Sequence, residues 1–101
     1  MSLEQLSIQP ADLKTISDAM LVDVREKFET DEGVIPGCVC IPLGELEEKC
    51  ESILDKAKSI VLYCAHGIRS LDAVFILKSK GFDKVHSLDG GYVAWLENKN
   101  Q

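Results

Sequence analysis

The sequence predicts an α/β domain built on a mostly parallel sheet, with helices on both faces. Short apolar runs alternate along the chain with longer segments in which apolar residues recur at helical spacing. The short runs are continuous rather than alternating, as expected for strands that are buried on both faces. The chain has 101 residues, which fits one small domain, since two would each lie near the size at which a core alone rarely suffices.

The short apolar runs mark the expected strands, taken in chain order. Leu6 to Ile8 is a weak run that we expect at a sheet edge, and Met20 to Val24 has a carboxylate near its end. Cys38 to Ile41 is bounded by Pro-Gly and by a further proline. Ile60 to Cys64 is the clearest strand, because it is rich in branched and aromatic residues. Lys84 to Leu88 is weaker and is closed by Asp-Gly-Gly.

Helical patterns fill the segments between these runs. Pro10 to about Ser17 begins with a proline, which a first helical turn tolerates. Glu45 to Lys58 carries an apolar stripe with charges on the opposite face. Arg69 to Lys80 carries a similar stripe and stops before Gly81, a good residue to end a helix. Tyr92 to Asn98 is a short final helix.

Composition and charge exclude several classes of protein. The hydrophobic fraction of 46% and the charged fraction of 28% are ordinary for a globular domain and argue against disorder. No apolar run approaches the roughly 20 residues that a bilayer span needs. The net charge of -6 disfavours broad binding to nucleic acid or to anionic membranes. Residues 1 to 5 lack the features of a secretory signal, so we expect a cytoplasmic protein.

The cysteines are expected to be reduced thiols. A zinc site favours C-x2-C pairs, often with histidines, whereas the only close pair here is Cys38 and Cys40. The histidines, His66 and His86, stand alone. We therefore expect no metal site, and reduced thiols are the rule in a cytosolic protein.

The segment from Cys64 to Ser70 carries the chemistry. Ligands of parallel sheets lie at the carboxyl ends of strands, and Cys64 ends the clearest strand just before a helix. Free N–H groups and the helix dipole stabilise a thiolate there, so we expect the pKa of Cys64 to lie well below that of an ordinary cysteine. Gly67 allows the loop to curl into an anion nest, and Arg69 adds a permanent cation. The alternative is a buried structural cysteine with a merely solvated arginine.

Several stretches together resemble one family. The loop has the pattern Cys64-x-x-Gly67-x-Arg69-Ser70. The other matching stretches are Leu21 to Glu26, Gly33 to Gly37, Ile41 to Leu43, Lys80 to Val85, and Leu88 to Tyr92 with Trp95. Over roughly Ser7 to Leu96 the chain resembles the rhodanese-type single-domain sulfurtransferases. It departs from the family pattern at Val34, where a histidine is usual, and at Cys38 and Cys40, where small or polar residues are usual.

This resemblance implies a rhodanese-like sheet of about five strands and a single domain over residues 1–101. It implies transfer of a sulfane sulfur from a donor such as thiosulfate to cyanide or a thiol, through a persulfide on Cys64. Arg69 would orient the anionic donor. The loop N–H groups would hold the persulfide charge, and no metal or organic cofactor would be needed. The residues expected to bind substrate are Asp23, Arg25, Ala65, His66, Gly67, Ile68 and Ser70.

Alternatives remain for individual residues. Asp23 and Arg25 either rim the site or brace a turn, with Glu29 as a partner for Arg25. His66 contributes either its imidazole or only its backbone N–H. The hydroxyl of Ser70 either caps the helix or touches the bound anion, and capping is the preferred interpretation. Cys38 and Cys40 either pack as small apolar groups or resolve an oxidised Cys64.

Two other functions are open. A carrier module that accepts sulfur from a partner desulfurase would use the same persulfide without turning over. A cysteine-dependent phosphatase of related fold would have five residues between the cysteine and the arginine, whereas this loop has the four residues 65–68. Because a phosphoryl group is bulkier than a sulfur atom, the shorter loop favours sulfur chemistry.

Overall fold

The computed structural model describes residues 6–16 and 18–99, so the absence of a secretory signal in residues 1 to 5 is a prediction that lies outside them. The described residues contain a five-stranded sheet in which every strand pair is parallel, and the strand order is β1-β5-β4-β2-β3. The predicted α/β class and the strand number are confirmed. The strands are β1 (Ser7–Ile8), β2 (Met20–Asp23), β3 (Val39–Cys40), β4 (Ile60–Tyr63) and β5 (Val85–Leu88).

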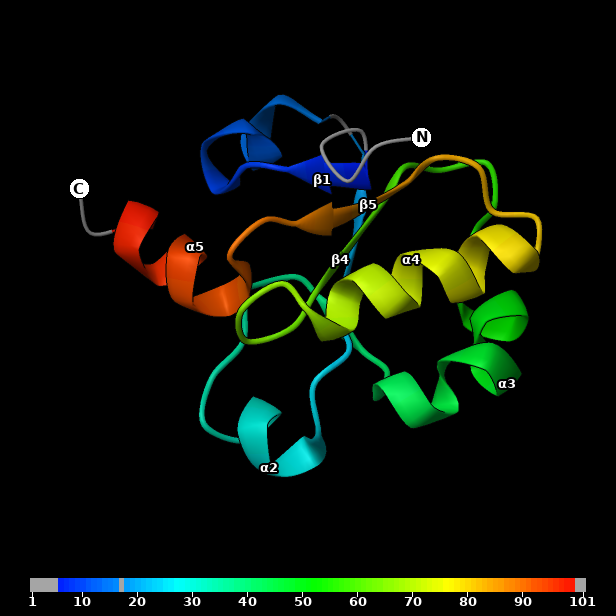
Figure 1. Ribbon diagram of the computed structural model, residues 1–101, viewed down its shortest axis with the longest axis horizontal. Coiled ribbons are helices and arrows are strands. Elements are labelled where there is room, and N and C mark those ends of the chain that lie inside the picture. The colour runs from blue at the N-terminus through cyan, green and yellow to red at the C-terminus, as the bar shows by residue number, and fades with distance from the viewer. Residues whose placement is uncertain (1–5, 17, 100–101) are drawn as a thin grey trace.

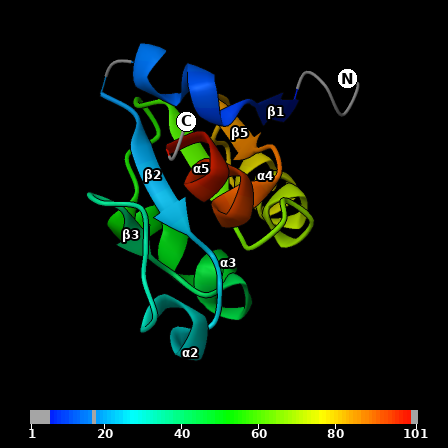
Figure 2. The same cartoon turned by 90° about the vertical axis from the view of Figure 1, so that its left-hand side faces the viewer.

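Helices cover both faces of this sheet (Figure 1). They are η1 (Pro10–Thr15), a 3₁₀ helix, α2 (Lys27–Thr30), α3 (Leu43–Ile53), α4 (Arg69–Ser79) and α5 (Gly91–Lys99). Buried side chains of α3 and α4 pack in one apolar cluster, and side chains of η1 and α5 pack in a second. Figure 2 shows α5 in front of the sheet, with α4 and α3 behind it and α2 below the ends of the strands.

The central strand β4 separates the two clusters and positions the loop that follows it. All four of its residues are fully buried, which explains the continuous apolar run in the sequence. Ile60 and Leu62 pack toward α3 and α4, whereas Val61 and Tyr63 pack toward η1 and α5. Cys64 follows this alternation and belongs to the cluster on the side of α4. Its thiol therefore lies on the opposite side of the sheet from the Tyr63 ring.

Two helix predictions need correction at their ends. The helix expected over Glu45 to Lys58 begins at Leu43 and stops at Ile53. It stops because Leu54 takes an extended conformation and buries its side chain, after which the Asp55 carboxylate accepts a hydrogen bond from the N–H of Ala57 (2.9 Å). The end expected near Ser17 for the first helix lies outside the described residues.

Helix α2 was not predicted. It is a single turn, so its four residues are too few to show helical periodicity. A capping box stabilises it, in which the side chains of Glu26 and Glu29 each accept a hydrogen bond from the other residue's backbone N–H. None of the described helices has the length and apolar character required to cross a membrane.

Candidate active site

The carboxyl ends of β2 and β4 meet at one edge of the sheet. Asp23 and Tyr63 are directly paired in register there, so the segments after both strands begin side by side. Cys64 starts the loop from β4 to α4, and Arg25 follows β2 two residues after Asp23. The structure thus brings together the two segments that the sequence assigned to the site, as the parallel topology requires.

The Cys64 thiol lies at the bottom of a cradle of hydrogen-bond donors. Its residue is 1% exposed, and its Sγ accepts a hydrogen bond from the N–H of Gly67 at 3.2 Å. Gly67 makes this turn with a φ of +93°, the curl expected from the sequence. Burial raises the pKa of the thiol, but hydrogen bonds from Ser70, His66 and Gly67 outweigh it. The pKa of Cys64 is therefore lowered below its ordinary value, as predicted.

The hydroxyl of Ser70 faces the thiol and does not cap the helix. Ile68 is the N-cap residue of α4 and no side chain caps this end, so the preferred capping role of Ser70 is wrong. Ser70 is fully buried because it points toward β5, where its Oγ lies 2.6 Å from the Oγ of Ser87. The same Oγ lies 3.7 Å from the Sγ of Cys64. Ser87, which the sequence did not single out, thus anchors a hydroxyl beside the sulfur.

Arg69 is held by a carboxylate from α2. Its Nη1 and Nη2 donate to the two carboxylate oxygens of Glu29 at 2.6 and 2.8 Å. The hydrogen bond to Arg69 is the main cause that lowers the pKa of Glu29 to about 2. The same ion pair, followed by the charge of Cys64, raises the pKa of Arg69. Glu29 was assigned to Arg25 from the sequence, and that pairing is wrong, as is the alternative of a merely solvated Arg69.

Arg25 braces the segment after β2. Its Nη2 donates to the Asp23 carboxylate at 2.8 Å and to the carbonyl of Gly33 at 2.6 Å, and both members of this ion pair are buried. Its guanidinium also lies over the ring of Tyr92, 4.4 Å from the ring centroid. This geometry favours the bracing role. A contact of Asp23 or Arg25 with substrate stays a prediction.

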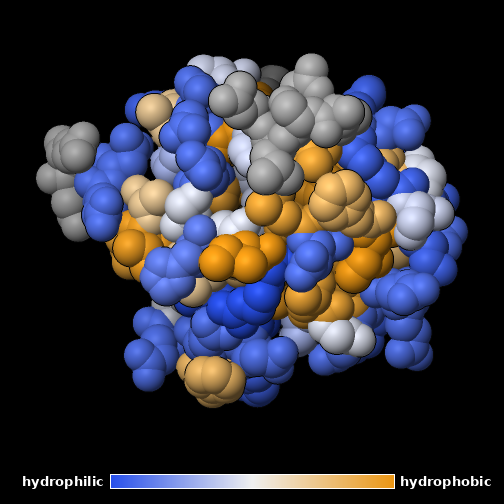
Figure 3. All heavy atoms as spheres, viewed as in Figure 1, coloured by the Kyte–Doolittle hydropathy of each residue, from blue (hydrophilic) through white to orange (hydrophobic). Residues whose placement is uncertain are grey.

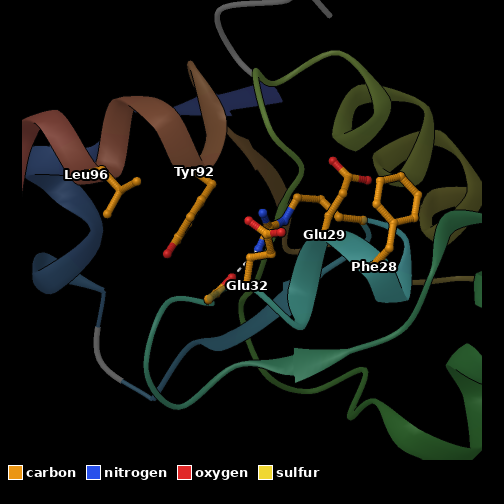
Figure 4. A pocket seen from close by; sticks show the side chains of 7 residues that line it. Phe28, Glu29, Glu32, Tyr92 and Leu96 are labelled. Carbon is orange, nitrogen blue, oxygen red and sulfur yellow. Dashed lines mark hydrogen bonds between the residues drawn. The ribbon is translucent and has the colours of Figure 1, made fainter.

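A cavity of about 460 Å³ lies between α2 and α5, beside the loop. Figure 4 shows Tyr92 and Leu96 entering it from α5, and Phe28 and Glu29 from α2. Its lining residues are Arg25, Phe28, Glu29, Glu32, Gly33, Tyr92 and Leu96. Glu29 connects the cavity to the loop, because the same carboxylate binds Arg69. Among these residues the sequence assigned only Arg25 to the site.

A family model for the rhodanese-like domain matches residues 8–98. The chain belongs to the rhodanese-like family. A sulfurtransferase of Allochromatium vinosum is 35% identical over 95 residues, covering 94% of this chain and 85% of the relative. The thiosulfate sulfurtransferase GlpE of Coxiella burnetii is 35% identical over 78 residues, covering 77% of this chain and 72% of the relative. The proposed sulfur carrier protein YrkF of Bacillus subtilis is 36% identical over 96 residues, 93% of this chain and 51% of the relative.

Solved structures agree with this assignment. A rhodanese-related protein of Thermoplasma volcanium superposes with a TM-score of 0.83 at 40% identity, covering 91% of each chain. The human single-domain sulfurtransferase TSTD1 has a TM-score of 0.80 at 27% identity, covering 91% of this chain and 96% of the other. The relatives support rhodanese-type sulfur transfer by a transferase and favour it over phosphatase chemistry.

In this rhodanese-like domain the start of α5 supports the reactive loop from behind. The N–H of Tyr92 donates to the carbonyl of Cys64 at 2.8 Å, and the N–H of Val93 donates to that of Ala65 at 3.1 Å. Gly91 allows this approach, since a Cβ there would lie 2.4 Å from the Cys64 oxygen. With the loop carbonyls bound to α5, the loop N–H groups are left to face the sulfur. The Gly-Gly pair in the family pattern was the sequence signal for this contact.

Gly91→Ala is expected to distort the loop and to lower both stability and Cys64 reactivity. The new methyl group would clash with backbone at a φ of +63°, which costs an L-residue roughly 1–2 kcal/mol by itself. Gly37→Ala is the matched control, because Gly37 also has a positive φ but open space around its Cα. Urea unfolding and the rate of Cys64 alkylation should be measured for both variants. A Gly91→Ala protein that behaves like Gly37→Ala would contradict the supporting role.

The remaining loop residues lie where a rim is expected. His66 and Ile68 are exposed, Ala65 is half-buried and Gly67 is buried. The exposed side chain of His66 does not test whether its imidazole takes part, so that role stays a prediction. Of the described residues, no three His, Cys, Asp or Glu side chains are grouped closely enough to hold a metal ion.

The other thiols are separated from Cys64. Cys38 packs on the side of the sheet facing α5, where it accepts a hydrogen bond from the Tyr63 hydroxyl at 3.4 Å. Its Sγ lies 3.9 Å from that of Cys40, which is exposed. Cys64 lies in the opposite cluster, so this geometry favours packing for Cys38 over a role in resolving Cys64. Cys50 is fully buried in α3.

Proposed function

We propose that this domain transfers a sulfane sulfur from a donor such as thiosulfate to a thiophilic acceptor through a persulfide on Cys64. The thiolate attacks the outer sulfur of thiosulfate, the S–S bond of the donor breaks, and sulfite leaves with the bonding electron pair. Cyanide or an acceptor thiolate then attacks the outer sulfur of the persulfide. This step forms thiocyanate or a new persulfide and returns the Cys64 thiolate. Two half-reactions on one nucleophile imply ping-pong kinetics.

The observation that carries this proposal is the buried thiol with its donors. A thiolate needs compensation when it is buried, and the N–H of Gly67 together with the hydroxyl of Ser70 provides it. A persulfide formed on Cys64 would add its terminal sulfur toward the N–H groups of residues 65–70, which are well placed to hold its negative charge. Arg69 adds a cation at the first residue of α4. No cofactor is required for these steps.

A sulfur carrier is the second candidate, because YrkF is among the relatives and a carrier would use the same persulfide. The surface near the ion pair favours a protein partner for either function. Ile68 is 74% exposed beside Arg69, and Phe28 is 73% exposed beside Glu29. Figure 3 shows apolar side chains over α4 next to hydrophilic ones over α2. Exposed apolar groups of this kind mark interaction sites. We propose a cytoplasmic protein of one domain, with no membrane or nucleic-acid partner.

Steady-state turnover separates these two candidates. An enzyme forms thiocyanate from thiosulfate and cyanide over many cycles, whereas a carrier stops after one sulfur atom for each protein molecule. Both candidates require that thiosulfate, or a partner persulfide, makes the protein heavier by one sulfur atom.

Limited alkylation with iodoacetamide below neutral pH is expected to label Cys64 first. The lowered pKa of Cys64 keeps part of it as thiolate at a pH where burial and the neighbouring Cys38 raise the pKa of Cys40 to about 11. The rate at Cys64 should therefore rise with pH earlier than the rate at Cys40. Peptide mapping should find the label on the Cys64 peptide, and brief thiosulfate treatment should leave that peptide one sulfur atom heavier. Earlier labelling of Cys38 or Cys40, or no gain of sulfur, would contradict the proposed persulfide site.

A further inference from the structure

Both arginines at the site are already neutralised by carboxylates. Arg25 is paired with Asp23, and Arg69 is paired with Glu29 through both terminal nitrogens of its guanidinium. Glu32 adds a further carboxylate in the wall of the cavity. Carboxylates therefore outnumber cations by one among the described charged residues of the cavity and the reactive loop. An incoming dianion meets no uncompensated cation among these side chains.

The ion pair between Arg69 and Glu29 is sheltered enough to matter. The Glu29 side chain is 19% exposed and the Arg69 side chain 36%, so solvent screens this pair less than a fully exposed one. Bidentate pairing also occupies the end of the guanidinium that would grip an oxyanion such as the sulfonate group of thiosulfate. A donor oxyanion would have to displace Glu29 or accept the weaker contacts of the remaining N–H groups.

We propose that Glu29 is a specificity-determining residue, which selects against dianionic donors by neutralising Arg69 and favours sulfane-sulfur donors of low net charge, such as the persulfide of a thiol. This inference rests on the proposed sulfur transfer. With such a donor, the Cys64 thiolate attacks the terminal sulfur of R–S–SH and the donor S–S bond breaks. The thiolate R–S⁻ leaves, and the persulfide proton stays on the transferred sulfur.

Glu29→Gln tests this role while preserving helix α2. Glutamine has nearly the volume of glutamate and also serves in a capping box, so it can still accept the hydrogen bond from the N–H of Glu26. It removes the charge that cancels Arg69. Asp31→Asn is the matched control, since Asp31 lies at the C-cap of the same helix and its 60% exposed side chain binds Lys27 instead.

The first measurement is kcat/KM with two donors of different charge. Thiosulfate is a dianion, and cysteamine persulfide has no net charge when its ammonium balances its perthiolate. Glu29→Gln is expected to raise the ratio of kcat/KM for thiosulfate to that for cysteamine persulfide by about tenfold. Asp31→Asn should change this ratio by less than about twofold, as a distant exposed charge does. An unchanged ratio in Glu29→Gln, an equal loss with both donors, or an equal rise in Asp31→Asn would overturn the proposal.

The second measurement does not depend on sulfur transfer. Iodoacetate and iodoacetamide alkylate the same thiol but differ by one negative charge. Glu29→Gln should raise the rate at Cys64 with iodoacetate relative to iodoacetamide, and Asp31→Asn should not. If neither donor places sulfur on Cys64 of the unmodified protein, the proposed function fails. The alkylation ratio then decides by itself whether Glu29 controls the access of anions.

Discussion

Cys64→Ser is expected to abolish sulfur transfer while leaving the fold intact. A serine hydroxyl remains protonated near neutral pH and is a far weaker nucleophile than a thiolate, so thiocyanate formation should fall by roughly 10³-fold or more. The smaller hydroxyl can still accept the hydrogen bond that the N–H of Gly67 now donates to the Sγ. Urea unfolding should therefore show only a small loss of stability. Turnover with thiosulfate and cyanide, together with the mass of the intact protein, measures the effect.

Cys40→Ser and Cys38→Ser are the controls for this result. Cys38 packs on the opposite face of the sheet and Cys40 is exposed beside it, so neither substitution should reduce turnover by much. A Cys64→Ser protein that still gains sulfur from thiosulfate would show that another thiol carries the reaction. That outcome would contradict the assignment of Cys64 and would leave the carrier alternative without its site as well.

The strands could be predicted because their burial is recorded directly in the order of residues. Strand β4 is buried on both faces, and its apolar run has no polar interruption until the loop begins. The position of Cys64 at the end of that strand and before α4 then places the thiol at a helix start, which is enough to predict the direction of its pKa shift. These inferences depend only on local order and on the parallel topology.

The partners of the charged residues could not be predicted in the same way. Glu29 lies 40 residues from Arg69 in the chain, and the turn of helix that presents it is too short to leave a periodic pattern. Ser70 could be placed at a helix start, but its orientation depends on Ser87 of β5, a contact between elements far apart in sequence. The end of α3 depends on the burial of Leu54, whose apolar character also fits a continuing helix.

Arg69→Ala is expected to reduce kcat/KM for thiosulfate by about 100-fold and to reduce it less for a donor of low net charge. A charge-assisted hydrogen bond to an oxyanion contributes roughly 1.5–3 kcal/mol, which corresponds to about tenfold or more. The substitution also leaves the Glu29 carboxylate without its partner, so that its pKa rises from about 2 toward the ordinary range. That carboxylate is still ionised at pH 7, and its uncompensated charge repels a dianionic donor by about as much again.

The double variant Arg69→Ala/Glu29→Gln separates these two effects. If the unpaired carboxylate causes part of the loss, removing its charge should restore about tenfold of the activity with thiosulfate and little of the activity with cysteamine persulfide. The four proteins of this cycle should be compared at pH 7 and low salt, where charge effects are largest, and then at high salt, where the restoration should shrink. An equal loss with both donors in Arg69→Ala, with no restoration in the double variant, would mean that Arg69 organises the loop around Cys64 and does not act through its charge on the donor.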